Sequence, residues 1–187
     1  AFLPSWSGAI SGDLDTVGES IAGMEFTNHD FDDEGNMYYL EADDYGNWMN
    51  NQFTLPGKGF HLLKIDPEGV VEYTDTISCS NYCNSPDYYY SKVVGVHAVS
   101  EDQVYVIMSV YNLGLTFGST YHSTSTYNLV TAFFDNGTWS WVDIEQTSNV
   151  GYNSLMYHGV DVDGNLYTVT RGSNSNSWQE YSVSSYS

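Results

Sequence analysis

The sequence predicts an all-β fold made of about three successive four-stranded antiparallel units, with the last unit one strand short. Three observations support this prediction. Short extended runs alternate with turns rich in Gly, Asn and Asp. The same pattern of runs and turns recurs along the chain. No window shows a convincing helical period, since glycines interrupt the nearest candidate, residues 14–24.

The first element of the repeat is a hairpin that occurs three times, at residues 26–42, 93–109 and 155–171. Each copy is an extended run, a tight turn of acidic residues or Gly and Asn, and a second run with a tyrosine near its start. These tyrosines are Tyr38, Tyr105 and Tyr167, spaced 67 and 62 residues apart. The spacing sets the length of the unit.

A second hairpin follows the first in two of the units, at residues 60–76 and 128–144. Its turns contain Gly69 and Gly137, which are 68 residues apart and match the first period. Each complete unit therefore has four strands, whereas the third continues only through residues 177–185. We expect a single domain over residues 24–187, with units at about 24–90, 91–153 and 154–187.

The second strand of each unit is a nearly continuous apolar run, as in residues 104–108. Such runs indicate burial on both faces of a sheet. Sheets stacked face to face around an axis meet that requirement, so we expect the units to be blades of a β-propeller-like fold. The turn at residues 161–167, Asp-Val-Asp-Gly-Asn-Leu-Tyr, resembles the blade turns of secreted bacterial β-propeller repeat proteins, and residues 33–38 are similar. The resemblance implies this architecture and no single function.

The missing fourth strand of the last unit predicts a partner for its open edge. Residues 1–23 form a separate N-terminal segment in this interpretation, and residues 1–13 are the candidate donor strand. The apolar residues of that strand are Phe2, Leu3, Trp6 and Ile10. It completes either its own last unit or that of a neighbouring copy, and head-to-tail exchange builds a ring or a filament.

The composition favours a folded protein outside the cell. Of 187 residues, 41% are hydrophobic and 16% aromatic, enough for a core. Four Lys and Arg stand against 24 Asp and Glu, and the net charge of -20 excludes nucleic acid as an expected partner. The start at Ala1, without Met or a basic leader, suggests an N-terminus left after removal of a signal peptide, and nothing predicts membrane insertion.

The chain has only two cysteines, Cys79 and Cys83, in a polar stretch unsuited to core packing. We interpret them as a local disulfide, which agrees with a secreted protein. The alternative is a pair of free thiols in a reducing compartment.

The longest connections all fall at one end of the predicted blades, opposite the short turns, and they are rich in aromatic and small polar residues. They are residues 43–59, 79–90, 111–127 and 146–153. Such loops can stack on sugar rings and hydrogen-bond to hydroxyl groups. The alternative is that they are only a polar covering. The binding-face candidates are Tyr45, Trp48, Tyr82, Tyr88, Tyr89, Tyr111 and Tyr121.

Three of the five histidines, His29, His97 and His158, occupy the same repeat position, 9, 8 and 9 residues before the repeated tyrosines. The first strand of a propeller blade is innermost, so these imidazoles are candidates for a site at the central axis, where they would bind a ligand or a metal. The competing interpretation is a structural hydrogen bond repeated in each unit, because repeat identity alone explains the spacing.

Two acidic turns are candidate Ca²⁺ sites: Asp30 and Asp32 in the first unit, and Asp161, Asp163 and Asn165 in the third. The chemistry of tight turns selects the same residue types and is the alternative explanation. Residues 136–138, Asn-Gly-Thr, form a glycosylation sequon with Asn136 as the acceptor, on a turn expected to be exposed.

The sequence contains no recognisable catalytic constellation, so we expect no enzyme. The leading hypothesis is an extracellular structural subunit whose partners are copies of itself, in a filament or ring. The alternative is an oligomeric, lectin-like propeller that binds glycans. A fragment of a longer propeller is a further interpretation of the incomplete unit.

Overall fold

The computed structural model describes residues 20–21, 24–25, 28–43, 47–48, 53–54, 58–80, 91–124, 126–147, 155–172 and 180–186. Every regular element in these residues is a β-strand, and every strand pair is antiparallel. None of the described sheets closes into a barrel. The predicted all-β class is therefore confirmed.

The first sheet has six strands in the order β12-β11-β8-β7-β4-β3. Four of them are the hairpin strands expected for the first unit: β3 (His29–Phe31), β4 (Met37–Asp43), β7 (Gly59–Ile65) and β8 (Val71–Cys79). The other two are β11 (Gly114–Phe117) and β12 (Thr120–Ser123), which come from later in the chain.

The second sheet has four strands in the order β14-β13-β10-β9, and the third has three in the order β15-β16-β17. The strands of the second sheet are β9 (Lys92–Ser100), β10 (Gln103–Tyr111), β13 (Tyr127–Asp135) and β14 (Thr138–Thr147). Those of the third are β15 (Leu155–Val160), β16 (Leu166–Gly172) and β17 (Glu180–Tyr186). Two short pairs complete the described strands: β1 (Ser20–Ile21) with β2 (Met24–Glu25), and β5 (Asn47–Trp48) with β6 (Phe53–Thr54).

The segment between Tyr111 and Tyr127 differs from the expected long loop, because it contains the β11–β12 hairpin. Strand β11 pairs with β8 through Leu115 opposite Cys79 and Phe117 opposite Ile77. Leu115 and Phe117 are buried and belong to the main hydrophobic core. Apolar burial and a free edge of the first sheet therefore explain why this connection folds as two more strands.

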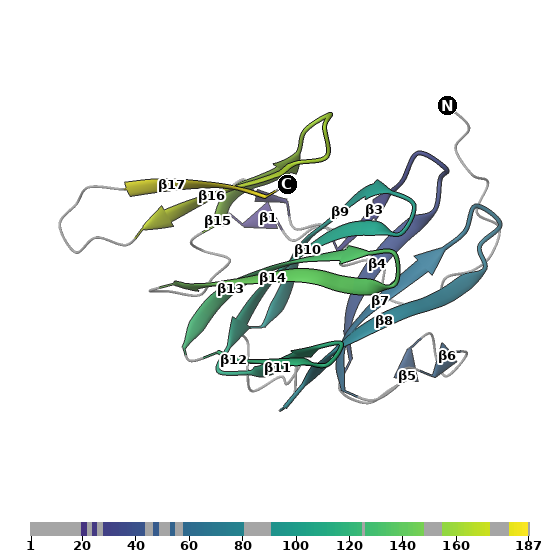
Figure 1. Ribbon diagram of the computed structural model, residues 1–187, viewed down its shortest axis with the longest axis horizontal. Coiled ribbons are helices and arrows are strands. Elements are labelled where there is room, and N and C mark those ends of the chain that lie inside the picture. Colours follow the sequence, from purple (N-terminus) through teal and green to yellow (C-terminus); the bar gives the residue numbers. More distant parts are fainter. Residues whose placement is uncertain are drawn as a thin grey trace.

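The sheets pack face to face in chain order. Between the first and second sheets, residues such as Tyr38, Leu62 and Val106 form the main core. Between the second and third, Tyr105 and Leu166 belong to a separate core. We call these contacts the first junction and the second junction. The second sheet, in the middle of Figure 1, is thus buried on both faces, as the continuous apolar run at residues 104–108 predicts.

The short hairpin turns lie at a common end of the sheets. In Figure 1 the tips of the β3–β4, β7–β8, β9–β10, β13–β14 and β15–β16 hairpins all point toward the upper right, and the β11–β12 hairpin lies at the opposite end. The turns of neighbouring sheets are therefore placed to contact one another.

Candidate functional site

The acidic turns share one construction. In the turns that begin at Asp32, Asp66 and Asp161, a carboxylate oxygen accepts a hydrogen bond from the amide four residues later, at 2.8, 2.8 and 2.9 Å. The glycine at the fourth position has a φ of 84 to 86° in each, a conformation that glycine adopts without strain. Hydrogen bonds from Asn165 lower the pKa of Asp161. These carboxylates therefore stabilise the turns themselves.

At the first junction, a tyrosine of one sheet binds the turn of the next. Tyr38 on β4 is fully buried, and its hydroxyl accepts a hydrogen bond of 2.7 Å from the amide of Asp102 in the β9–β10 turn. The hydroxyl also lies 3.3 Å from the carboxylate of Asp102. Burial raises the pKa of Tyr38 to about 12, so the hydroxyl stays protonated.

A cation reinforces this junction. The ammonium of Lys64 on β7 lies 2.9 Å from the carboxylate of Glu101 and 3.2 Å from that of Asp102. It also lies 5.8 Å from the centre of the Tyr38 ring. Burial lowers the pKa of Lys64, but the hydrogen bonds to Glu101 and Asp102 outweigh burial and raise it. The cluster joins the first sheet to the turn of the second.

The second junction repeats the tyrosine contact. Tyr105 is 2% exposed, and its hydroxyl donates a hydrogen bond of 3.1 Å to the carbonyl of Gly164 in the β15–β16 turn. Burial, with a smaller effect from Asp161, raises the pKa of Tyr105. The side chain of Trp141 on β14 stacks on Tyr186 of β17, with ring centres 5.0 Å apart. Apolar and aromatic packing holds these sheets together without an ion pair of the Lys64 type among the described residues.

The third repeated tyrosine, Tyr167, lies on β16 in the outer face of the third sheet. It is 37% exposed, whereas Tyr38 and Tyr105 are 0% and 2% exposed. We call this surface the terminal face; Tyr167, its register partner Ser185 and Val169 share it, because side chains alternate along a strand. A hydrogen bond to Asp161 of its own turn raises the pKa of Tyr167.

Two of the three repeated histidines meet across the second junction. Nε2 of His97 on β9 lies 2.7 Å from Nδ1 of His158 on β15. One of these nitrogens is protonated and donates the hydrogen bond, and the other accepts it. Burial lowers the pKa of both to about 4. For His158, the neighbouring His97 lowers the pKa further and a hydrogen bond with the backbone of Val94 opposes the shift. The pair is neutral at pH 7.

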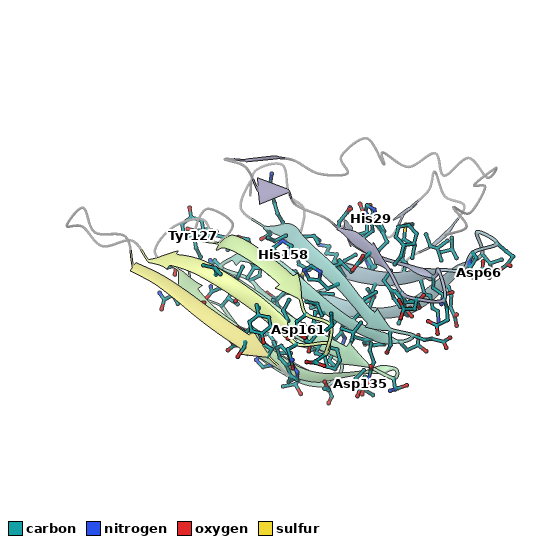
Figure 2. All side chains as sticks on the ribbon, turned by 90° about the horizontal axis from the view of Figure 1, so that it is seen from above. His29, Asp66, Tyr127, Asp135, His158 and Asp161 are labelled. Atoms are coloured by element: carbon teal, nitrogen blue, oxygen red, sulfur yellow. The ribbon has the colours of Figure 1, made fainter. Side chains whose placement is uncertain are left out.

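His29 does not join this pair. Its Nδ1 lies 3.4 Å from the side-chain oxygen of Asn28, and its ring lies edge-on to Phe31. The residue that links the first sheet to the pair is Asp30, whose carboxylate accepts a hydrogen bond of 3.1 Å from the amide of Ala98 and lies 3.9 Å from Nδ1 of His97. Figure 2 labels His29, on β3, and His158, on β15.

A glycine makes room for the histidine pair. A Cβ atom built on Gly95 would lie 2.7 Å from a ring carbon of His158 and 3.0 Å from Nδ1. Any larger residue at this position therefore displaces the imidazole. The spacing of the histidines predicted a shared position, but no signal in a single sequence predicted the role of Gly95.

The candidate metal residues do not gather into a site among the described residues. No group of three His, Cys, Asp or Glu side chains able to hold a metal occurs there. Asp32 and Asp161 bind their own turns, Asp30 binds Ala98, and the amide of Asp163 donates to the carboxylate of Asp161. Calcium binding stays a prediction without support from this geometry.

The predicted binding-face residues are only partly described. Tyr111 packs against Tyr127 with ring centres 4.7 Å apart, and Tyr121 on β12 is 61% exposed. Trp48 lies on β5, with its side chain outside the described set. Tyr45, Tyr82, Tyr88 and Tyr89 lie outside the described residues, as do Phe2, Leu3, Trp6 and Ile10 of the candidate donor strand. Both predictions stay open.

The two covalent predictions concern the disulfide and the glycosylation site, and only the second falls on an exposed residue. Cys79 at the end of β8 is disulfide-bonded; the only other cysteine in the sequence, Cys83, lies outside the described residues. Asn136 is exposed in the β13–β14 turn, next to Asp135, which Figure 2 labels at the edge of the molecule. The sequon is therefore on the surface.

A small cleft of about 210 Å³ opens beside the first junction. Its lining residues are Lys64, Glu72, Thr74, Asp102, Phe134 and Gly137. This volume is below the range of about 300 to 1,000 Å³ that small-molecule sites usually have. Because the cation in its wall is already paired with two carboxylates, the cleft offers little to an anionic ligand.

No family model, curated protein or solved structure matches the chain. Among the described residues, no helix has the length and apolar character needed to cross a membrane.

Proposed function

We propose that the chain is an extracellular structural subunit, with propeller-like blades, that assembles head to tail with copies of itself. The observation that carries the proposal is the repeated junction. Each of two sheets presents a buried tyrosine to the turn of the next sheet, and the third presents the equivalent Tyr167 to solvent. The stack is built by one repeated contact, and the last copy of that contact has no partner turn among the residues the structure describes. Such a stack is suited to continue into another molecule.

The contacts between first strands support the propeller-like arrangement. Asp30 on β3 binds the backbone of β9 through Ala98, and His97 on β9 binds His158 on β15. In a propeller the first strands of successive blades are neighbours around the axis. The disulfide at Cys79 and the net charge of -20 support a location outside the cell.

We further propose a non-enzymatic role. The half-buried histidine pair has neutral imidazoles, and the carboxylate of Asp30, 3.9 Å from His97, is already hydrogen-bonded to an amide. The hydrogen bonds of these groups join neighbouring sheets, and this structural role explains their position without a catalytic one.

Electron microscopy and sedimentation velocity of the purified protein over a wide concentration range test the proposal. We expect rings or filaments, with a sedimentation coefficient that rises with concentration. A protein that stays monomeric at every concentration would contradict self-assembly. Class averages without radially arranged sheets would contradict the propeller-like arrangement separately.

Glycan binding is a second candidate function, favoured by the aromatic residues at the end opposite the turns. Exposed Tyr121 and the Tyr111–Tyr127 pair lie there, and aromatic planes stack on sugar rings. Glycan-array binding that is lost on Tyr121→Ala would support this function. Tyr167→Ala, a change at another exposed tyrosine, is the matched control and is expected to leave glycan binding unchanged.

A further inference from the structure

We propose that Tyr167 on the terminal face binds the β3–β4 turn, residues 32–36, of a second copy of this chain. This inference rests on the proposed self-assembly and names the contact that produces it. It is drawn from the two junctions inside the molecule, both of which pair a tyrosine of one sheet with the first hairpin turn of the next.

The internal contacts define what the terminal face needs. The hydroxyl of Tyr38 accepts a hydrogen bond from the amide of Asp102, and the hydroxyl of Tyr105 donates one to the carbonyl of Gly164. In both junctions the partner is the backbone of a turn, so the contact depends on the shape of the turn more than on its side chains. Tyr167 stands at the same position of the repeat, 62 residues after Tyr105, and no turn of a following sheet covers it among the described residues.

The first unit holds the complementary part. Its β3–β4 turn shares with the β15–β16 turn the hydrogen bond from the fifth-residue amide to the first-residue carboxylate, and Gly35 and Gly164 have φ values of 85 and 84°. Asp33 and Glu34 of this turn are exposed. Among the described hydrogen bonds, no tyrosine of the same chain reaches it. Within the described part of the chain, Tyr167 therefore has no turn of a following sheet and the β3–β4 turn has no tyrosine, which is the requirement for a heterologous contact between copies.

The hydroxyl chemistry is compatible with this contact. A tyrosine hydroxyl has one donor hydrogen and two acceptor lone pairs. In the single chain the hydrogen of Tyr167 is directed to Asp161, and the oxygen can still accept an amide hydrogen, as the oxygen of Tyr38 does from Asp102.

The contact is expected to be limited in area. Met37, Tyr39, Leu63 and Ile65, on the face of the first sheet opposite the first junction, are already buried in one chain. A second copy therefore meets the turn and its surroundings and does not bury that apolar face. Association should accordingly be reversible and dependent on concentration.

The first experiment compares Tyr167→Ala with Tyr121→Ala in sedimentation equilibrium. Both tyrosines are exposed, at 37% and 61%, and only the first is in the proposed contact. We expect Tyr167→Ala to weaken association about tenfold, the effect of losing a contact of about 1.4 kcal/mol, and Tyr121→Ala to associate like the unchanged protein. Thermal unfolding of each variant verifies that the chain still folds.

The second experiment traps the contact. Tyr167→Cys protein is mixed with Glu34→Cys protein under mild oxidation, and covalent dimers are counted by mass spectrometry. We expect dimers that join the two variants to exceed dimers of either variant alone, whereas Tyr121→Cys mixed with Glu34→Cys should give few. Dimers formed mainly between two Tyr167→Cys chains would overturn the head-to-tail contact, because they would show that the terminal face pairs with itself.

The failures can be told apart. If the unchanged protein is monomeric at all concentrations, the proposed self-assembly is wrong. If it assembles, and Tyr167→Ala assembles equally well, self-assembly stands and the role of Tyr167 is wrong.

Discussion

The two junctions use the same tyrosine contact but surround it differently. At the first junction, Tyr38 lies in the larger core and beside the ammonium of Lys64. At the second, Tyr105 lies in a smaller core next to an aromatic stack and the His97–His158 pair. The tyrosine and the turn are therefore the constant part of the interface, and each junction adds its own polar cluster.

Removing the tyrosine rings should have the largest effect on stability. Tyr38→Ala and Tyr105→Ala each leave a cavity in a packed interface and are expected to lower the free energy of unfolding by about 3 to 5 kcal/mol. Tyr167→Ala is the matched control. At a protein concentration low enough to keep the chain monomeric, it should lower the free energy of unfolding by less than about 0.5 kcal/mol, because the ring is partly in solvent. Urea denaturation followed by fluorescence measures all three.

Phe substitutions then separate the ring from its hydroxyl. Tyr38→Phe and Tyr105→Phe should each cost about 1 kcal/mol. An equal loss of stability for Tyr167→Ala and Tyr105→Ala would contradict the distinction between a filled junction and a free face.

The sequence predicted that the three tyrosines occupy equivalent positions of a repeat, but it did not predict what they contact. Their recurrence set the length of the repeat, and the hairpins, turns and two-sided burial followed from local patterns that a single chain displays. The contact of Tyr38 with Asp102 joins residues 64 positions apart, and no local pattern reports which turn a distant hydroxyl will reach. The repeat position of Tyr167 suggested that it is equivalent to the others, and only the exposures show that it is used differently.

The histidines and the loop show two other limits. Equal repeat positions predicted one environment for His29, His97 and His158, yet only the last two meet, because the second junction brings β9 and β15 together there. The segment that contains Leu115 was predicted as a long loop because it lies between the two expected hairpins of its unit, at residues 93–109 and 128–144. Its pairing with β8 depends on a free sheet edge that the sequence does not reveal.

Acid should weaken the second junction before it affects the turns. The pKa values of His97 and His158 are lowered from 6.5 to about 4 in the folded chain, so the folded state binds fewer protons than the unfolded state between these values. Their contribution to stability is complete above pH 6.5 and is lost as the pH falls toward 4. In this pH range, each histidine that stays neutral in the folded state makes the free energy of unfolding fall by up to about 1.4 kcal/mol for each pH unit of acidification.

Chemical denaturation at a series of pH values measures this slope, and a variant with His97→Gln and His158→Gln is the control. Protonation of carboxylates remote from the pair is common to both proteins, so the difference between the two slopes isolates the pair. Asp161, whose pKa is lowered below its usual 3.8, loses its contribution only at lower pH. Parallel curves for the two proteins between pH 6.5 and 4 would show that the pair carries no such linkage.

Filling the space at Gly95 should damage the second junction alone. Gly95→Ala places a methyl group against the ring of His158, and overpacking of this kind costs about 1 to 3 kcal/mol. The same change made together with His158→Ala should cost much less, because the clashing ring is gone. A double-mutant cycle measures this coupling, and additive effects would mean that the two residues do not compete for space.

Loss of the cation at the first junction should have the smallest effect. Lys64→Met keeps the buried part of the side chain and removes its pairing with Glu101 and Asp102, whose side chains are 61% and 41% exposed. Because such exposed partners are well solvated, we expect a loss of about 1 kcal/mol or less. In 1 M NaCl the difference between Lys64→Met and the unchanged protein should shrink, since salt screens the ion pairs. A loss that salt leaves unchanged would show that Lys64 acts through packing against Tyr38, and the first junction would then resemble the second in having no stabilising ion pair.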